Sequence, residues 1–309
     1  VARRPTRVLP PVTAGDFLRF GWPDGIAPLV SILYFWSYLS ADAIVPAMTI
    51  PIVLGQAVIL FATVGQLARR EGGPAAGAVA VGVLATSSVL LWGVAMGQET
   101  GLTALALVAM FLFIQRHRED SNLQWLTWAG VAAGTGALAR EYGLAFIVLG
   151  AVALAWQHVS RRGWIAFLAT AGLVALPWYL RNALRTGHPL YNHDFGSLFP
   201  TNPVGTEYLR IVAGFHDIGH TPGLRAKLAG LLLLLAGVPL LIGTIYGLTC
   251  LRRRGPWLVA LLAVGGFWLW SVGQTSGGPT YSLRVLTPAI SLGAALAGLQ
   301  LARFATGPR

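Results

Sequence analysis

The feature of this sequence that most constrains its fold is a succession of long apolar segments separated by short polar turns. Of its 309 residues, 55% are hydrophobic and only 11% are charged, whereas about a quarter of the residues of an ordinary soluble domain are charged. A helix that crosses a bilayer needs about 20 mostly apolar residues. The sequence therefore predicts an all-α polytopic membrane protein and excludes a disordered chain.

The apolar segments predict about nine transmembrane spans. We place them near residues 44–68, 74–96, 101–115, 123–139, 142–158, 164–180, 228–250, 257–274 and 283–302. A shorter, aromatic-rich segment at 26–40 predicts an interfacial amphipathic helix that lies among the headgroups. The chain then divides into an external loop with this helix, an N-terminal transmembrane bundle, a second external loop and C-terminal transmembrane helices, at 1–43, 44–180, 181–227 and 228–309.

The positions of the arginines predict the orientation of the spans, because short cytoplasmic loops collect Arg and Lys. When the spans alternate in direction, five arginine clusters fall on the same face of the membrane. These clusters are Arg69-Arg70, Arg116 with Arg118, Arg161-Arg162, Arg252 to Arg254, and Arg303 with Arg309. We assign this face to the cytoplasm. The opposite face, which holds most of the acidic residues, would then face the periplasm of a bacterial inner membrane.

The net charge of +11 does not indicate nucleic-acid binding, because the arginines are scattered singly or in short clusters between apolar segments. Glycines spaced as Gly-x-x-x-Gly, at Gly130 and Gly134, predict close helix packing.

A transporter is one functional hypothesis for a polytopic membrane protein. The interiors of the spans, however, carry almost none of the ionisable residues that a transporter predicts.

Three arginines on the predicted outer face depart from the orientation rule and are candidates for chemistry. Arg140 and Arg284 lie in short turns, and Arg181 directly follows a span. A guanidinium group offers a planar fork of donors that suits phosphate oxygens. We therefore predict that these arginines bind a lipid-linked phosphate. An ordinary headgroup anchor is the alternative for Arg181.

Several short motifs carry a family resemblance in their order and sidedness. They are Pro-Trp-Tyr-Leu-Arg-Asn at 177–182, Thr-Gly-His-Pro-Leu-Tyr at 186–191, Gln98-Glu99, Ala-Arg-Glu-Tyr-Gly at 139–143, and Arg284 with Pro288. Together they resemble the C-type (GT-C) superfamily of membrane glycosyltransferases, similar to bacterial protein mannosyltransferases and aminoarabinose lipid A transferases. The likeness extends over nearly the whole chain.

The resemblance implies transfer of a sugar from a polyprenyl-phosphate donor to a lipid, glycan or protein acceptor at the outer face of the membrane. It implies donor-phosphate binding by Arg181, Arg284 and Arg140, and a donor or acceptor loop that includes His188 and Tyr191. The family generally carries its catalytic base, an Asp or an Asp/Glu pair, after its first span. That motif is absent from the printed chain, which is either truncated upstream or has lost it. Glu99, Asp16 and Asp24 are the remaining catalytic candidates.

The missing acidic motif also supports a rival hypothesis, a catalytically silent scaffold or accessory subunit of a larger membrane complex. No cofactor is predicted with certainty. The spacing of His216 and His220 is compatible with a divalent metal, but nearby Gly and Pro residues argue for a loop, so no metal ligand is assigned. The expected partners are the polyprenyl-phosphate donor, membrane lipids and possible further subunits.

Overall fold

The computed structural model describes residues 27–41, 45–190, 237–271 and 281–306, together with Lys227. Regular structure within these ranges is entirely helical. Among the predicted functional residues, Asp16, Asp24, Tyr191, His216 and His220 lie outside the described residues. The helices are α2 (Leu29–Ala41), η1 (Pro46–Thr49), α3 (Ile50–Ala85), α4 (Ser88–Ala95), α5 (Thr100–Asp120), α6 (Leu123–Ala139), η2 (Glu141–Gly143), α7 (Leu144–Trp156), α8 (Arg161–Thr186), α11 (Gly237–Thr249), α12 (Leu251–Ser271), η4 (Leu283–Leu286) and α14 (Thr287–Thr306).

Capping residues in the sequence explain where several of these helices begin and end. The side chain of Asn122 accepts a hydrogen bond from the Gln124 N–H at the start of α6. Ser160 caps α8 in the same way through the Gly163 N–H. At the other end of α8, Gly187 takes a left-handed conformation with φ of 79°, which glycine adopts without steric cost.

The helix α3 is folded into two segments at Gly73. This residue has φ of 83° and ψ of −178°, and Pro74 follows it. The segments 50–72 and 74–85 turn back on each other, since a Cβ added at Gly77 would lie 2.8 Å from the Gly65 carbonyl oxygen. The sequence predicted a break between two spans at this position, and the structure confirms the break.

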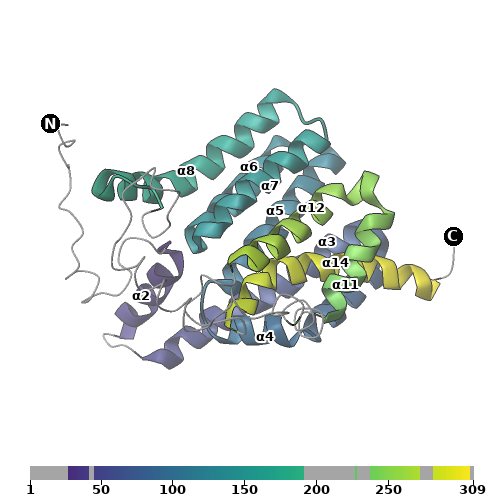
Figure 1. Cartoon of the computed structure of the whole chain (residues 1–309), viewed down its shortest axis with the longest axis horizontal. Coiled ribbons are helices and arrows are strands. Elements are labelled where there is room, and N and C mark those ends of the chain that lie inside the picture. The colour runs from purple at the N-terminus through teal and green to yellow at the C-terminus, as the bar shows by residue number, and fades with distance from the viewer. Residues whose placement is uncertain (1–26, 42–44, 191–226, 228–236, 272–280, 307–309) are drawn as a thin grey trace.

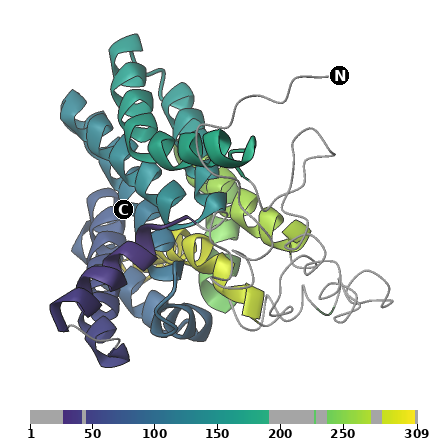
Figure 2. The same cartoon turned by 90° about the vertical axis from the view of Figure 1, so that its left-hand side faces the viewer.

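The helices pack side by side into a bundle, in which α14 lies among α3, α5, α11 and α12 (Figure 1, Figure 2). α14 contacts α3, α5, α11 and α12, and most of its length is buried. Small residues allow this, because a Cβ added at Gly293 would lie 2.5 Å from the Pro239 carbonyl oxygen. α5 to α8 run alongside one another on the other side of the bundle (Figure 1).

The glycines of α6 bring it against α8, as the sequence predicted. A Cβ added at Gly130 would lie 2.3 Å from the Phe167 carbonyl oxygen, and one at Gly134 would lie 2.8 Å from that of Ala171. Both distances are too short for any side chain. The Gly-x-x-x-Gly spacing is therefore a packing motif in this protein.

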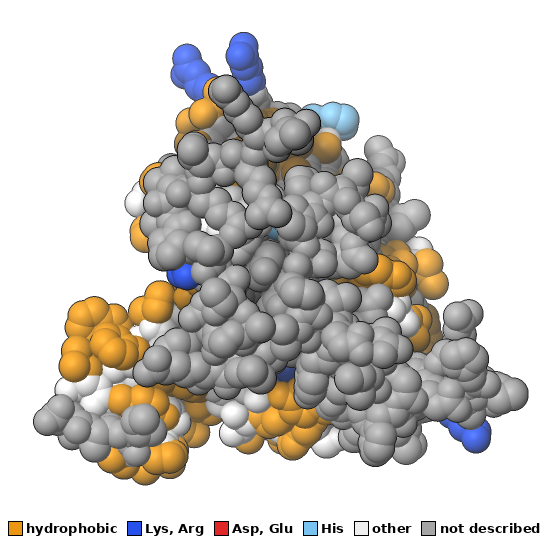
Figure 3. All heavy atoms as spheres, turned by 60° about the vertical axis from the view of Figure 1, so that its left-hand side comes forward, with side chains coloured by type: hydrophobic (Ala, Val, Ile, Leu, Met, Phe, Trp, Pro, Cys, Tyr) orange, Lys and Arg blue, Asp and Glu red, His pale blue; other side chains and the backbone are white. Residues whose placement is uncertain are grey.

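The apolar outer surface of the bundle fits a membrane protein. Large hydrophobic residues on α8 and α3 are exposed, with Leu173 76% exposed and Val58 67% exposed, and hydrophobic side chains form broad patches in the space-filling view (Figure 3). Within the described ranges, 4 helices are long and apolar enough to cross a bilayer. They are Pro46–Ala85, Thr100–Asp120, Arg161–Thr186 and Leu283–Phe304. The full set of nine spans stays a prediction.

The segment predicted as an interfacial helix is helical, at α2. Its Tyr34 hydroxyl donates to the Gly97 carbonyl oxygen, and its Ser37 hydroxyl donates to that of Met48 at 2.8 Å. Phe35 and Trp36 are 58% and 63% exposed. These contacts fix α2 to the end of the bundle that carries Gly97, and its position among headgroups stays a prediction.

Candidate functional site

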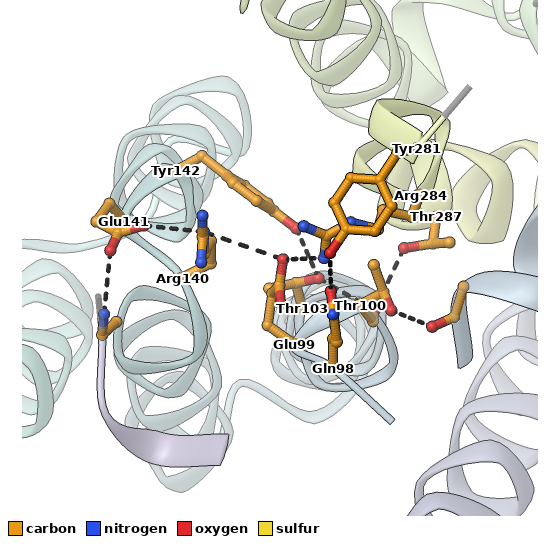
Figure 4. Close-up of polar contacts among 12 residues, drawn as sticks. Gln98, Glu99, Thr100, Thr103, Arg140, Glu141, Tyr142, Tyr281, Arg284 and Thr287 are labelled. Atoms are coloured by element: carbon orange, nitrogen blue, oxygen red, sulfur yellow. Dashed lines mark hydrogen bonds and ion pairs between the residues drawn. The ribbon is translucent and has the colours of Figure 1, made fainter. Parts of the chain in front are cut away.

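A buried ion pair between Glu99 and Arg284 forms the centre of the candidate site (Figure 4). Glu99 directly precedes α5, and Arg284 lies in η4 at the head of α14. Arg284 Nη1 lies 2.5 Å from Glu99 Oε1, and each side chain is 9% exposed. A charged pair this deep in the protein needs close mutual contact to offset the loss of hydration, and the short distance provides it.

Arg140 extends this pair toward Glu141. Its Nε lies 3.1 Å from Glu141 Oε2 and 3.9 Å from Glu99 Oε1. Burial opposes the charge on Arg140, but Glu141 and then Glu99 raise its pKa above the ordinary value. The other carboxylate oxygen of Glu141 accepts a hydrogen bond from the Ala27 N–H at 3.0 Å, which ties the chain just before α2 to this site.

Aromatic and hydroxyl groups surround the charged cluster. The Tyr281 ring lies under the Arg284 guanidinium, with 4.2 Å between Cζ and the ring centroid, and its hydroxyl donates to Gln98 Oε1 at 2.9 Å. The Tyr142 hydroxyl lies 3.0 Å from Thr103 Oγ1. These contacts restrict the rotation of the side chains that carry the charges.

Two helix N-termini meet at the same place. α5 begins at Thr100 and α14 at Thr287, and the Thr287 hydroxyl donates to the Thr100 carbonyl oxygen at 3.3 Å. The N-terminus of a helix carries a partial positive charge. The site therefore places positive dipole ends beside Glu99, and these dipole ends favour an approaching anion.

The arginines of the cluster differ in what they offer to a ligand. Arg284 is buried and engaged with Glu99. Arg140 is 32% exposed, and its ion-pair contacts with Glu99 and Glu141 are made through Nε. Two arginines balance two glutamates among the described residues of the cluster, so an incoming phosphate would rely on the partly exposed Arg140 side chain and on the helix dipoles rather than on an excess of charge.

Arg181 is not part of this cluster in any contact within the described chain. Its guanidinium lies over the Trp178 ring, 4.7 Å from the centroid, and donates to Asn182 Oδ1 at 2.9 Å. It is nevertheless close to the same end of the bundle, because the neighbouring Tyr179 hydroxyl donates to the Ala137 carbonyl oxygen at 2.7 Å. Its role as a phosphate ligand stays a prediction.

His188 occupies a structural position at the end of α8. It is 1% exposed, and its Nδ1 accepts a hydrogen bond from the Leu190 N–H at 2.8 Å. The backbone N–H of His188 donates to Thr186 Oγ1 at 3.1 Å. These bonds shape the turn that leads into the loop beyond Leu190, and a direct contact of His188 with substrate stays a prediction.

A second ionic cluster lies at the opposite end of the bundle. Glu71 accepts hydrogen bonds from Arg118 and Arg254, and Arg70 pairs with Glu119. Arg118 and Glu119 belong to the last turn of α5, whereas Glu99 precedes its first. Arg70, Arg118 and Arg254, which the sequence assigned to one face, thus lie at the other end of α5 from the cluster around Glu99.

Sequence reasoning missed several residues of the site. Glu141 was noted only as part of the Ala-Arg-Glu-Tyr-Gly motif at 139–143, and Gln98, Tyr142, Tyr281 and Thr103 received no role. A Tyr or Thr within an apolar helix is ordinary in sequence terms, and only the contacts between α5, η2 and η4 reveal that these groups meet. Within the described ranges, no group of three or more His, Cys, Asp or Glu side chains is placed to hold a metal ion.

Comparison with known proteins bears on this arrangement. Residues 30–180 match the family model described as dolichyl-phosphate-mannose-protein mannosyltransferase. The chain resembles the C-type membrane glycosyltransferases. The matched region contains Glu99, Arg140 and Glu141 and ends one residue before Arg181. No curated protein and no solved structure gives a significant match.

The match to the glycosyltransferase model supports a membrane-embedded transferase and sugar transfer from a polyprenyl-phosphate donor. The matched region runs from α2 into α8 and contains Glu99 and Arg140. Arg284 comes from the region outside the match, and the structure brings it into contact with Glu99.

Proposed function

We propose that this chain transfers a sugar from a polyprenyl-phosphate donor to a lipid, glycan or protein acceptor at the outer face of a bacterial inner membrane. The observation that carries the proposal is the cluster of Arg284, Glu99 and Arg140 at the N-termini of α5 and α14. It lies within a chain whose residues 30–180 match a mannosyltransferase family.

In the reaction, a base takes the proton of an acceptor hydroxyl, and the acceptor oxygen attacks the anomeric carbon of the sugar. The bond between that carbon and the phosphate oxygen breaks, and the polyprenyl phosphate leaves with the electron pair. Charge develops on the leaving phosphate, and positively charged donors stabilise it. We assign this contact to Arg140, because its side chain is 32% exposed, and to Arg181 at the same end of the bundle.

The contacts of Glu99 support a positioning role more than that of the base. Its carboxylate lies beside two guanidinium groups and is bonded directly to Arg284, and its side chain is only 9% exposed, so little of it is left to accept a proton from an acceptor hydroxyl. Glu99 would then hold Arg284 in place and keep Arg140 oriented toward the phosphate.

Asp24 and Asp16 remain the candidates for the base. Ala27 donates to Glu141 in the site, and it follows Asp24 by three positions in the sequence. Three residues span at most about 11 Å, which is compatible with a carboxylate from this segment acting beside Arg140. If neither acid is required, the scaffold hypothesis is favoured, because the Glu99 carboxylate is buried against Arg284.

A donor-turnover assay tests the enzyme hypothesis. Purified protein in lipid nanodiscs is incubated with polyprenyl-phosphate-linked sugars and a membrane extract as acceptor, and release of polyprenyl phosphate is measured. Release that disappears in Asp24→Asn or Asp16→Asn supports catalysis. No release with any donor, or unchanged release in both variants and in Arg140→Gln, contradicts the proposed mechanism.

Cysteine labelling tests the proposed orientation separately. In a Cys250→Ser background, single cysteines are introduced at Met48, which lies near the Glu99 end, and at Ser121, which follows α5 at the other end. We expect a membrane-impermeant maleimide to label M48C, and not S121C, in intact cells. The reverse pattern would place the site in the cytoplasm.

A further inference from the structure

Two adjoining hollows lie at the end of the bundle opposite to Glu99, among residues that the proposed transfer reaction does not use. The smaller has a volume of about 210 Å³ and lies between α5, α7 and α12. The larger, of about 590 Å³, lies between the end of α5 and the start of α8. Arg118 and Gln157 line both, so the hollows adjoin (ends of α5, α7 and α8 in Figure 1).

The smaller hollow contains a buried amide without a partner. Gln115 is 3% exposed, and within the described part of the chain neither its Oε1 nor its Nε2 makes a hydrogen bond. Buried polar groups in folded proteins nearly always have a partner. Because Gln115 lines this hollow, a group that both donates and accepts hydrogen bonds is needed there.

The larger hollow has a different character, because the described residues that line it include two arginines and two histidines and no carboxylate. Arg118, Arg162, His117 and His158 contribute to its wall. Ser160, which also lines it, caps the N-terminus of the 26-residue helix α8. The positive end of the α8 dipole adds to the charge of the arginines, and this combination is typical of sites that bind phosphate.

The one carboxylate of the smaller hollow does not cancel this positive charge. Glu71 is bonded to both Arg118 and Arg254, so the three side chains together carry one net positive charge. Arg118 is 45% exposed and extends between the two hollows. It can therefore contact a ligand while still bonded to Glu71.

We propose that these adjoining hollows form a second binding site, separate from the transfer site, for a phosphate ester. Arg118 and Arg162 bind the phosphate at the α8 N-terminus. When the ligand is a lipid, a hydroxyl of its headgroup extends into the smaller hollow and bonds to the Gln115 amide. The same phosphate chemistry can be supplied by a lipid headgroup or by free phosphate, and the experiment separates the two sources.

Binding is measured on the purified full chain in neutral detergent, by native mass spectrometry for retained lipid and by thermal unfolding. The probes are phosphatidylglycerol, diacylglycerol as its counterpart without phosphate, and inorganic phosphate against chloride at equal ionic strength. We expect a one-to-one phosphatidylglycerol adduct and a raised Tm, with no effect of diacylglycerol. A rise in Tm with inorganic phosphate alone identifies free phosphate as the source.

The neighbouring arginines of α8 provide a matched pair of variants. Arg162 lines the hollow and Arg161 does not, although both are exposed and belong to the first turn of α8. Loss of a charged hydrogen bond weakens binding by roughly tenfold or more, so we expect that loss in Arg162→Gln and a change of less than about twofold in Arg161→Gln. Equal losses in both variants would show nonspecific charge attraction and overturn the proposal.

Gln115→Leu tests the closed end of the site. We expect it to weaken phosphatidylglycerol binding by roughly tenfold, while Tm without lipid stays equal or rises, because the uncompensated amide is removed. Unchanged lipid binding, with the same rise in Tm, would mean that Gln115 faces water only and would overturn its assignment. Absence of any phosphate-dependent effect on the wild-type protein would overturn the site as a whole.

Discussion

Glu99 and Arg284 lie 185 residues apart in the sequence, yet their side chains form a buried ion pair at 2.5 Å. This contact joins the N-terminus of α5 to the head of α14, and it is one of several contacts between the part of the chain that matches the mannosyltransferase model and the part that does not. It therefore has both a structural and a proposed functional role, and the two can be separated by experiment.

Glu99→Gln should reduce sugar transfer by about 100-fold or more, because Glu99 orients Arg140, to which we assign stabilisation of the leaving phosphate. It should also lower the free energy of unfolding by about 3 to 5 kcal/mol, since it leaves Arg284 buried without its charge partner. Chemical unfolding and the turnover assay measure the two effects.

A double-mutant cycle separates the pair from its surroundings. Each single change leaves one buried charge without its partner, whereas the double variant Glu99→Gln, Arg284→Gln removes both charges. The double variant should therefore be more stable than the sum of the two single losses predicts. Additive stability losses would show that the contact contributes little, and full transfer activity in the double variant would exclude both residues from the site.

Arg181→Ala should lose most transfer activity, by about 100 to 1,000-fold if its guanidinium binds the donor phosphate. Arg181→Lys keeps the charge but loses the planar fork of donors, so we expect an intermediate rate. Steady-state kinetics with varied donor concentration measure the loss. Wild-type rates in Arg181→Ala would identify Arg181 as a headgroup anchor that stacks on Trp178.

At the other end of the bundle, the two arginines that bind Glu71 should differ in their effect on stability. Arg254 is 6% exposed, whereas Arg118 is 45% exposed. We expect Arg254→Gln to destabilise the protein by about 3 to 5 kcal/mol, because it leaves a buried carboxylate with one partner fewer. Arg118→Gln should cost no more than about 1 kcal/mol.

Thermal unfolding of the two variants in detergent without added lipid provides the comparison. A larger loss in Arg118→Gln than in Arg254→Gln would contradict the view that burial sets the strength of these ion pairs. Transfer activity, corrected for the folded fraction, should change little in Arg254→Gln, since Glu71 and Glu99 lie at different ends of α5.

Gly130→Ala should destabilise the packing of α6 on α8 by about 1 to 3 kcal/mol, because the added Cβ would lie 2.1 Å from Thr170 Oγ1 and 2.3 Å from the Phe167 carbonyl oxygen. Gly172→Ala on α8 is the matched control. Nothing lies within 4 Å of its added Cβ, so it should stabilise the helix by about 0.5 to 1 kcal/mol. A stabilising Gly130→Ala would contradict the close approach of the two helices.

Helix positions followed well from the sequence because they depend on local information. The segment predicted at 123–139 coincides with α6, and the limits of α7 and α8 fall within several residues of prediction. Capping by Asn122 and Ser160, and the break at Gly73 before Pro74, are local signals of the same kind. Bundle packing could not be predicted in this way, since the contacts of α14 with α3 and α11 depend on shape over its whole length.

The candidate site could be predicted only in part. Alternation of the spans was sufficient to put Glu99, Arg140 and Arg284 on one face, and the structure brings these three together. The same reasoning could not predict whether the Arg181 side chain contacts this cluster, because the direction of that side chain depends on the rotation of α8 about its axis. The amide of Gln115 drew no attention in the sequence, because a single Gln in an apolar helix gives no sign that it lies beside a hollow.

The two ionic clusters at the ends of α5 also define the membrane thickness that suits this protein. Twenty residues separate Glu99 from Glu119, which corresponds to about 30 Å along a helix, close to the hydrocarbon thickness of a typical bilayer. In lipids with much shorter or longer acyl chains, hydrophobic mismatch would require the helices to tilt or the bilayer to deform. The acyl-chain length used for reconstitution is therefore a variable that acts on both clusters at once.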